Sequence, residues 1–517
     1  MKKIVIIGAG PAGLTLAYYL LKNSKDYEVL IIEKSNQVGG ISKTIVYNGN
    51  RMDLGGHRFF TKQKEINDIW NEILLPQNKR SKDEIYLDLK NNYDKKGLDP
   101  EKEDKVFLKR RRISRIYYKR KFFDYPISLS FNTIKNLGII DTMLSGFSYL
   151  KSMIKKLPED NLENFYINRF GKKLYQVFFR DYTEKLWGIS PKDIDSSWGS
   201  QRVKGISIKE VLKDSFKRLF KIKNKKIETS LIDSFNYPKY GPGQMYEEMA
   251  NKIIELGGII KLNSEVIKIN KKNNFIESII YKENKKIIKE KVDYLVSSMP
   301  IKDLIMNLNN VPNDITNIAK KLPYRDFVTV GLVLDKLKIK NNTKIKTINN
   351  NIPDTWIYIQ SSEVKLGRIQ IFNNWSPYLV KDYLKTVSLG LEYFCNYNDS
   401  FWKKSDLDLK EYAYRDLMKI GIIDNNSKIL DYHIERVEKA YPAYFGSYKN
   451  FNQVKDYLNS INNLYCIGRN GMHRYNNMDH SMYSGIVCAK NIINNISSKE
   501  NIWSVNTEGD YHEEKNN

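Results

Sequence analysis

Three glycines near the N-terminus have the spacing of a loop that binds a dinucleotide. Gly8, Gly10 and Gly13 lie in the segment GAGPAG, between the apolar run IVII and the helical pattern LTLAYYLLKN. Gly8 permits a tight turn, Gly10 lets backbone N–H groups approach a pyrophosphate, and Gly13 lets the helix pack closely on the strand. The N-terminus of that helix supplies a site for an anion. The chemistry expected here is therefore the binding of a pyrophosphate.

An acidic residue completes this pattern at the expected distance. Glu33 ends the second apolar run, EVLIIE, 20 residues after Gly13. A carboxylate at the end of the second strand can accept the hydroxyl protons of an adenosine ribose. Strand, loop, helix, strand and acid in this order predict a dinucleotide site far more specifically than the glycines alone. The alternative, a glycine-rich turn in an unrelated α/β domain, treats Glu33 as a coincidence.

Two further glycine pairs suggest which dinucleotide binds. Gly39-Gly40 and Gly55-Gly56 both follow Glu33 closely, and His57 comes directly after the second pair. Such pairs allow the backbone to pass close to a large flat ligand, which favours FAD over NAD. His57 is equally compatible with a packed core position and with a place beside the cofactor.

The elements that position these residues come from separate parts of the chain. The β-α-β pattern at the N-terminus predicts an α/β fold with a Rossmann-like FAD-binding domain. Further segments with the sequence pattern of buried strands occur later in the chain, for example YLVSSMP and LYCIGRNG. The intervening charged, helical and aromatic-rich stretches predict an interleaved mixed α+β substrate domain, and no internal repeat is present. The predicted division is FAD-binding segments 1–75, 226–300 and 425–495, an inserted helical substrate domain 76–225, a substrate-domain sheet 301–424 and a polar tail 496–517.

Composition restricts the class of protein. The 517 residues include 85 Lys+Arg and 60 Asp+Glu, a formal net charge of +25, but the lysines are widely spread, so specific nucleic-acid binding is not expected. The basic run from Lys109 to Lys121 fits either a solvated strand face or a contact with phosphates or acidic lipid. Three cysteines form no metal or disulfide pattern, and no segment has about 20 consecutive apolar residues. We expect a globular cytoplasmic protein without a metal site.

Taken in order, these motifs resemble a known group of flavoproteins. Glu33, the two glycine pairs with His57, VSSMP and the terminal Ile-Gly-Arg469-Asn-Gly resemble the FAD-dependent amine oxidase, protoporphyrinogen oxidase and phytoene desaturase group. This resemblance implies FAD bound by a Rossmann-like domain of the glutathione reductase type. The FAD contacts that it implies, in addition to the fingerprint glycines and Glu33, are Ala12, Lys34, Gly40, Gly56, His57, Val266, Arg469, Asp479, His480 and Ser481.

Within this group the chain looks most like the UDP-galactopyranose mutases, particularly those of eukaryotic type. The closer resemblance is carried by motifs spread over most of the chain. They are Tyr125-Pro126, the run from Tyr182 to Ile189, Trp198-x-x-x-Arg202, Asn374-x-Ser-Pro377, Tyr441-Pro442, and Arg474-Tyr475 with Asn477-x-Asp-His480-Ser.

The mutase resemblance implies an activity and a substrate. The activity is the interconversion of pyranose and furanose forms of a sugar nucleotide through N5 of reduced FAD, without net oxidation, for surface polysaccharide synthesis and with NAD(P)H as a reductant. It implies that Arg202, Arg368, Tyr441 and Tyr475 hold the diphosphate, which fits the charge-assisted bonds that guanidinium groups make to phosphate. The remaining implied roles are Asn477 near the pyranose, Tyr358 near the uracil and His57 beside the flavin.

Departures from the mutase pattern leave other functions open. Trp375 replaces a tyrosine of the eukaryotic enzymes, and Met478 replaces a glutamine, which puts the identity of the sugar in doubt. An FAD-dependent oxidoreductase acting on an amine, porphyrinogen or polyene is the alternative, since Arg202 and Arg368 could each belong to a structural ion pair. A noncatalytic flavoprotein at a membrane surface is a third reading, and the oligomeric state is open.

Overall fold

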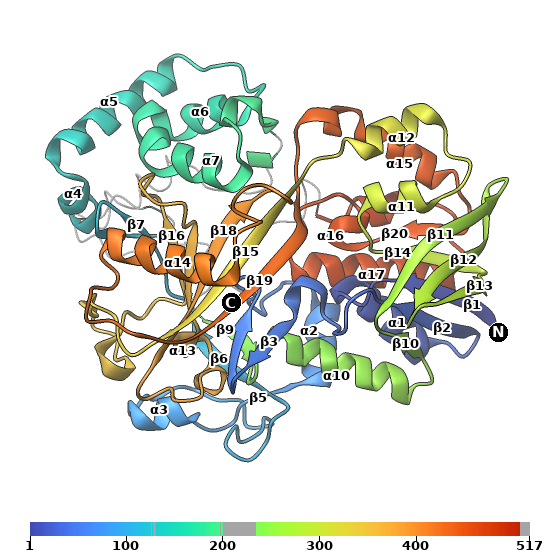
Figure 1. Ribbon diagram of the computed structural model, residues 1–517, viewed down its shortest axis with the longest axis horizontal. Helices are drawn as coiled ribbons and strands as arrows, with labels where there is room; N and C mark the ends of the chain where they lie inside the picture. The colour runs from blue at the N-terminus through green and yellow to red at the C-terminus, as the bar shows by residue number, and fades with distance from the viewer. Residues whose placement is uncertain (126, 128–130, 197, 200–233, 507–517) are drawn as a thin grey trace.

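The dinucleotide fingerprint lies in a five-stranded parallel sheet. The computed structural model describes residues 1–125, 127, 131–196, 198–199 and 234–506 (Figure 1). The strand order is β10-β2-β1-β14-β20, and all neighbours run parallel. The strands are β1 (Lys2–Ile7), β2 (Tyr27–Ile32), β10 (Ile259–Lys261), β14 (Tyr294–Ser297) and β20 (Leu464–Cys466).

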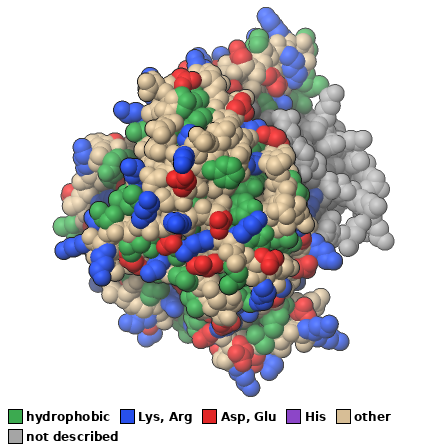
Figure 2. Space-filling view, turned by 90° about the vertical axis from the view of Figure 1, so that its right-hand side faces the viewer, with side chains coloured by type: hydrophobic (Ala, Val, Ile, Leu, Met, Phe, Trp, Pro, Cys, Tyr) green, Lys and Arg blue, Asp and Glu red, His purple; other side chains and the backbone are tan. Residues whose placement is uncertain are grey.

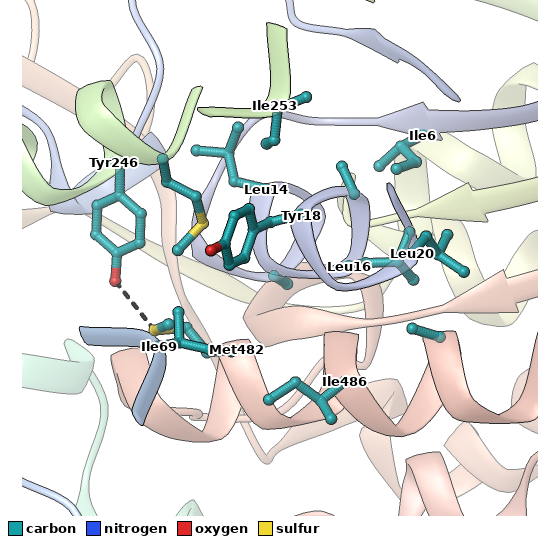
Figure 3. Packing of buried hydrophobic residues seen from close by; sticks show 14 of the residues in the cluster. Ile6, Leu14, Leu16, Tyr18, Leu20, Ile69, Tyr246, Ile253, Met482 and Ile486 are labelled. Carbon is teal, nitrogen blue, oxygen red and sulfur yellow. Dashed lines mark hydrogen bonds between the residues drawn. The ribbon is translucent and has the colours of Figure 1, made fainter. Parts of the chain in front are cut away.

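The side chains of this sheet alternate between two cores, one on each face, and helices cover the first of these faces. Ile4 and Ile6 of β1 point into a core shared with the helices α1 (Pro11–Asn23), α10 (Pro242–Glu255) and α17 (Met478–Ile493). Figure 3 shows this packing, in which the hydroxyl of Tyr246 on α10 donates to the sulfur of Met482 on α17 at 3.6 Å. The α1 and α17 helices thereby fix the loops at the ends of β1 and β20.

The opposite face of the sheet has its own core. Val5 and Ile7, which alternate with the residues just named, contact this second cluster. An antiparallel three-stranded sheet and three helices cover it on the right of Figure 1. These elements are β11 (Ser264–Lys272), β12 (Phe275–Glu283), β13 (Lys286–Lys291), α11 (Ile301–Asn307), α12 (Asn313–Lys320) and α15 (Phe451–Asn459).

A second, larger sheet lies beside the first domain and ends in a helical layer. Its strand order is β19-β15-β18-β17-β16-β7-β8, and α14 (Asp406–Ile420) packs on the cluster at one face. Four helices, α4 (Phe131–Leu137), α5 (Ile139–Ile154), α6 (Leu162–Tyr175) and α7 (Asp181–Trp187), form the layer at the upper left of Figure 1. The seven strands are β7 (Ser114–Tyr118), β8 (Lys121–Asp124), β15 (Tyr324–Leu334), β16 (Trp356–Ile359), β17 (Arg368–Ile371), β18 (Val387–Cys395) and β19 (Ile429–Pro442).

Small elements connect the two sheets. The hairpin of β3 (Thr44–Tyr47) and β4 (Asn50–Asp53) leads into the segment that carries His57. A three-stranded sheet follows, made of β5 (Leu75–Pro76), β6 (Val106–Arg111) and β9 (Ser234–Pro238). Other short helices include α2 (Lys64–Ile73), α3 (Lys82–Tyr86), α13 (Phe372–Trp375), α16 (Gly468–Gly471) and α18 (Glu500–Trp503).

The α/β fold class with a Rossmann-like domain is confirmed, and the structure refines two details of the predicted organisation. Strands β6, β7 and β8 fall within residues 76–225, which we expected to be chiefly helical. The predicted segment 425–495 begins with β19, yet this strand pairs with β15 in the large sheet. The division into domains otherwise stays a prediction.

The expected polar tail is wrong for its first part. Ile502 and Trp503 of α18 are buried, as is Val505, and all three contact one of the two cores of the parallel sheet. Arg474 donates a hydrogen bond to the carbonyl of Val505 at 2.9 Å. These three buried apolar residues and hydrogen bonds of this kind anchor the segment to the rest of the fold. Residues 507–517 lie outside the described ranges.

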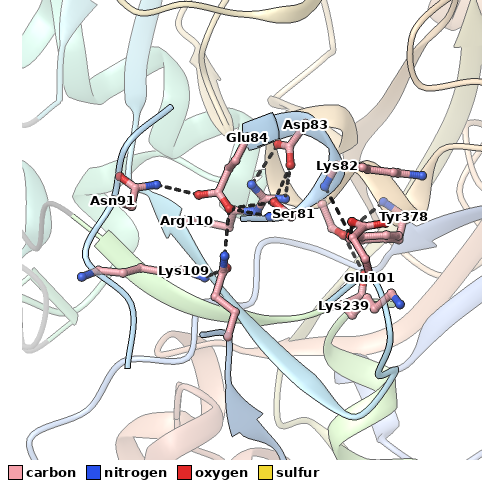
Figure 4. A network of polar contacts seen from close by, with 12 residues as sticks. Ser81, Lys82, Asp83, Glu84, Asn91, Glu101, Lys109, Arg110, Lys239 and Tyr378 are labelled. Atoms are coloured by element: carbon pink, nitrogen blue, oxygen red, sulfur yellow. Dashed lines mark hydrogen bonds and ion pairs between the residues drawn. The ribbon is translucent and has the colours of Figure 1, made fainter. Parts of the chain in front are cut away.

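The basic run is divided between the interior and the surface. The buried Arg110 pairs with Asp83 at 2.9 Å, within the polar network drawn in Figure 4, and Arg115 pairs with the buried Asp354 at 2.5 Å. Lys119 and Lys121 are exposed at the β7–β8 turn. The run is therefore no continuous solvated face, because two of its arginines, Arg110 and Arg115, bond to carboxylates inside the fold.

The surface elsewhere is mixed. On the face shown in Figure 2, basic and acidic side chains alternate, and hydrophobic side chains form small scattered groups. Among the described helices, none is both long and apolar enough to cross a bilayer.

Candidate functional site

A cavity of about 600 Å³ opens at the carboxyl ends of the parallel strands. We call it the nucleotide cavity; Gly8, Gly10 and Ala12 line it together with Glu33, at the N-terminus of α1. Gly8 has a φ of +101°, and a Cβ there would lie 2.2 Å from Oγ of Ser298, so this turn requires glycine. The exposed backbone at a helix N-terminus is suited to a phosphate.

Gly13 serves the loop indirectly. It does not line the nucleotide cavity, and a Cβ on it would come within 2.1 Å of the Gly8 carbonyl oxygen. This close approach lets α1 start directly beneath the loop, as the fingerprint predicts. Gly10 and Gly40 also approach each other, because a Cβ on Gly40 would lie 3.3 Å from the Gly10 Cα.

The Glu33 carboxylate supports the loop and still has capacity for a ligand. One oxygen accepts the Ala9 N–H at 2.8 Å, and the other accepts the N–H and the hydroxyl of Ser35 at 2.8 and 2.7 Å. A carboxylate has about four acceptor sites, so a ribose hydroxyl can also be bound. Glu33 therefore has both a structural role and a place at the cavity wall.

The structure gives a different reason for glycine at position 56 from the one that the sequence suggested. A Cβ there would lie 1.9 Å from the Trp356 ring, so the backbone approaches an indole of the second sheet rather than a ligand alone. Gly55 adopts a φ of +106°, which turns the chain toward His57. The second glycine pair thus joins the two sheets.

A second cavity, of about 300 Å³, adjoins the first. Five cationic side chains line it, against a single carboxylate, that of Asp479, among the described lining residues, and we call it the cationic cavity. Both cavities share His57, Arg469 and Asn477 as lining residues. The five cations are Arg58, Lys62, Arg112, Arg368 and Arg469. Such a wall attracts an anionic ligand.

Arg368 on β17 is held from several sides. Its guanidinium bonds Glu392 at 3.1 Å, the Tyr441 hydroxyl at 3.2 Å, and the hydroxyl of Tyr182 on α7. Glu392 is fully buried on β18, and burial raises the pKa of its carboxyl while Arg368 opposes that rise. The structural ion pair considered for Arg368 is therefore present, yet the same side chain also lines the cationic cavity.

Two tyrosines and an arginine form a stacked wall beside Arg368. The rings of Tyr441 and Tyr475 stack with centroids 5.4 Å apart, and the Arg469 guanidinium lies 4.8 Å from the Tyr475 centroid. Arg469 also donates to the carbonyls of Asn476 at 2.9 Å and Ala440 at 3.1 Å. These bonds fix a cation at the point where the cavities meet.

His57 lies at this junction as a neutral ring. Its Nδ1 is 3.0 Å from the Gly55 carbonyl oxygen, which can only accept, so Nδ1 carries the proton and Nε2 is an acceptor. Burial lowers the pKa of His57 to about 4, and the positive charge of Arg469 contributes to this decrease. The ring is therefore uncharged at neutral pH.

The N-terminus of α17 forms the remaining wall. Asn477 is the N-cap residue, and its backbone N–H donates to Nδ1 of His480 at 3.3 Å in a capping box. Asp479 and His480 line the cationic cavity, whereas Ser481 lines the nucleotide cavity. A helix N-terminus thus faces both cavities and favours negative charge there.

The predicted site residues separate into the two cavities. Lys34, Gly40 and Val266 line the nucleotide cavity, and Gly56, Tyr358, Arg368, Tyr441 and Tyr475 line the cationic cavity. Arg202 lies outside the described residues. Trp375, which replaces a tyrosine of the eukaryotic mutases, is fully buried and donates to the Thr355 carbonyl at 2.8 Å.

Sequence reasoning missed several residues of the cationic cavity. Arg58 follows His57 directly, Lys62 lies in the same segment, and Arg112 belongs to the basic run. Trp356 also lines this cavity, and Tyr182, which bonds to Arg368, belongs to the run from Tyr182 to Ile189 but had no assigned role. The clustering of Arg58 and Lys62 after a glycine pair was the available signal.

Comparisons with known proteins agree with this fold. Residues 6–73 match the family model of the NAD(P)-binding Rossmann-like domain. Coproporphyrinogen III oxidase of Staphylococcus aureus (strain NCTC 8325 / PS 47) is 32% identical over 76 residues, which span 15% of this chain and only 16% of that relative.

Solved structures match over nearly the whole chain. A reduced UDP-galactopyranose mutase superposes with a TM-score of 0.75 and 20% identity, covering 98% of this chain and 99% of the other. A putrescine oxidase bound to putrescine gives 0.59 and 14% identity, covering 95% and 99%. At these identities the likeness establishes the fold alone.

Proposed function

We propose that the protein binds FAD in the nucleotide cavity and a sugar nucleotide in the cationic cavity, and that it interconverts pyranose and furanose forms of that sugar. The observation that carries this proposal is the junction of the two cavities at His57, Arg469 and Asn477. A ligand in the cationic cavity would there meet the reactive end of a cofactor bound along the parallel sheet. Five cations favour a substrate with a diphosphate.

The residues present fit FAD. The glycine turn and the N-terminus of α1 suit the pyrophosphate, and Glu33 has acceptor capacity for the ribose. Asn470 supports the same assignment, because its buried Oδ1 has no partner among the described residues and the side chain lines the nucleotide cavity. A volume of about 600 Å³ is within the usual range for cofactor sites.

Reduced FAD, when bound, would supply a nucleophilic N5 for substitution at the anomeric carbon, from which the diphosphate leaves and to which it returns. The protein's side chains would hold the leaving diphosphate: Arg368 by charge, and Tyr441 and Tyr475 by hydroxyl donation. Arg469 fixes positive charge at the junction. His57, being neutral, adds no charge that would repel these guanidinium groups.

The aromatic walls would orient the nucleoside and exclude water. Tyr358 contacts Tyr125 in a tilted arrangement with ring centroids 4.6 Å apart, and both line the cationic cavity beside Trp356. Planar side chains of this kind suit a pyrimidine ring. Bringing the anomeric carbon to one fixed position accounts for much of the rate such a site can provide. NAD(P)H is the proposed physiological reductant.

An FAD-dependent oxidoreductase is the second candidate. The pairing of Arg368 with Glu392 favours it, because a guanidinium already neutralised by a buried carboxylate has less charge available for a phosphate. A cavity walled by Trp356, Tyr358 and Phe60 would also accept an apolar substrate. In this case hydride transfer from substrate to FAD replaces isomerisation.

Redox dependence tests the proposal. The protein is reduced with dithionite under argon and incubated with UDP-galactofuranose, and UDP-galactopyranose is followed by chromatography. We expect conversion in the reduced state and none in the oxidised state. Arg368→Gln should abolish conversion, while Arg110→Gln, which breaks a buried ion pair outside both cavities, should leave it intact. Absence of conversion in both states, with reduction of the flavin by an amine or polyene, would favour the oxidoreductase.

A further inference from the structure

Helix α5 presents its apolar residues outward. Ser145 and Ser152 are buried against the protein, and Ser148 accepts the N–H of Lys173 on the neighbouring α6. This arrangement inverts the usual amphipathic helix, whose apolar stripe faces the core. The outward side chains, with 41–89% of their surface exposed, are Ile139, Ile140, Met143, Leu144, Phe147, Leu150, Met153 and Ile154.

The size of this face distinguishes it from the rest of the surface. Eight large apolar side chains on one helix exceed the patches of roughly 300–600 Å² that are the largest on a typical monomer. Elsewhere, as on the side shown in Figure 2, hydrophobic groups are small and separated by charges. Figure 1 places α5 along the outer edge of the helical layer, with α6 on its inner side. An apolar face in this position indicates an external partner.

Charge around the face narrows the choice of partner. Lys135, Lys151 and Lys155 are exposed at its two ends, and Asp141, the single acidic residue of α5, pairs with Lys173 at 2.9 Å. A second copy packed through the same face would bring these lysine rims together, because a two-fold contact repeats the same patch on both partners. An anionic lipid surface instead complements them.

We propose that α5 docks on an anionic membrane, with its apolar face in the boundary between headgroups and acyl chains and its lysines among the headgroups. Helices that lie in an interface combine a broad apolar face with basic residues in this way. The basic run offers fewer charges for such binding than its sequence suggests, since Arg110 and Arg115 are engaged with carboxylates inside the fold. The proposal does not depend on the proposed function.

Vesicle sedimentation of the full-length protein tests this directly. The vesicles are phosphatidylcholine alone, or phosphatidylcholine with a quarter of phosphatidylglycerol. We expect binding to the anionic vesicles at 50 mM salt that weakens at 500 mM, because electrostatic attraction is screened. Ile140→Ser with Phe147→Ser should weaken binding at least tenfold, since both side chains would leave the lipid.

A matched control uses exposed apolar residues elsewhere. Val46 and Ile287 are 60% and 71% exposed, close to the values of the α5 pair, and lie on strands far from it in sequence. Val46→Ser with Ile287→Ser should leave vesicle binding unchanged. Lys151→Glu with Lys155→Glu should lower binding to the anionic vesicles at least fivefold and leave any weak binding to neutral vesicles unaffected.

The outcomes separate the partners. Absence of binding by the unaltered protein, or equal binding by the α5 variant and the control, would overturn the proposal. Dimerisation that Ile140→Ser with Phe147→Ser abolishes, seen by light scattering without vesicle binding, would assign the face to a second copy. A large fall in melting temperature of the α5 variant alone would show that the chain itself covers the face.

Discussion

The two cavities are built in different ways. The backbone of the glycine loop and the N-terminus of α1 form one end of the nucleotide cavity, and close contacts at Gly8 and Gly13 fix the shape of this end. Side chains from remote strands and helices form the cationic cavity; Arg58, Arg368 and Arg469 come from three separate parts of the chain. A binding site formed by backbone suits a cofactor that does not vary, whereas a site formed by side chains can change when the substrate changes. The difference explains why the cofactor is easier to infer than the reaction.

The largest expected effect is on the glycine loop of the nucleotide cavity. Gly13→Val places side-chain atoms where a Cβ is already 2.1 Å from the Gly8 carbonyl oxygen, so the loop and α1 cannot keep their positions. We expect loss of bound FAD and a decrease of more than about 3 kcal/mol in the free energy of unfolding. Gly146→Ala in α5 is the matched control, because a Cβ added there would meet no other atom of the described residues within 4 Å. Retention of yellow colour by Gly13→Val would contradict this picture of the loop.

The next prediction distinguishes an effect on stability from an effect on ligand binding in the cationic cavity. Arg368→Gln and Arg110→Gln each leave a buried carboxylate unpaired, which should lower the free energy of unfolding by about 3–5 kcal/mol in urea denaturation. Calorimetry should show UDP affinity weakened by about 1.5–3 kcal/mol in Arg368→Gln alone. Equal UDP affinity in the two variants would remove Arg368 from the ligand site.

An effect of intermediate size is expected on the pH dependence of stability, at a buried carboxyl near the two cavities. Asp53 is buried at the end of β4, just before the segment that carries His57. Its carboxyl accepts hydrogen bonds from the hydroxyls of Thr44 and Tyr237, and burial raises the pKa of Asp53 to about 7. The folded protein therefore holds this proton more tightly than the unfolded chain, and stability is lost as pH rises through 7. Between pH 5.5 and 7, Asp53→Asn should become more stable relative to the unaltered protein by about 2 kcal/mol. A pH-independent difference in urea denaturation would contradict the buried, protonated carboxyl.

The smallest effect concerns a single hydroxyl. Tyr475→Phe keeps the stacking on Tyr441 and Arg469 and removes only the proposed donor to phosphate. We expect UDP to bind about 0.5–1.5 kcal/mol more weakly, with the FAD content unchanged. Tyr432→Phe, on the exposed part of β19, is a suitable control. An unchanged dissociation constant for UDP would limit Tyr475 to stacking.

The same contrast explains how far the sequence could predict the molecule. The loop from Gly8 to Gly13 with Glu33 was predictable because the ligand contacts follow one another along a single β-α-β unit. The Arg368–Glu392 pair was not, because it depends on the register of β17 against β18. Gly56 was expected to approach a ligand, but its neighbour is Trp356, 300 residues later. The burial of Trp503 likewise requires a core that forms only in the complete fold.

Titration of the bound flavin's visible spectrum tests the central claim most directly. In the oxidised protein, UDP should perturb the flavin bands saturably while uridine, which lacks the diphosphate, should not, because the cations beside His57 and Arg469 select phosphate next to the cofactor. No perturbation by UDP, together with bleaching of the flavin by an amine or a porphyrinogen, would contradict the account and assign the cationic cavity to an oxidoreductase.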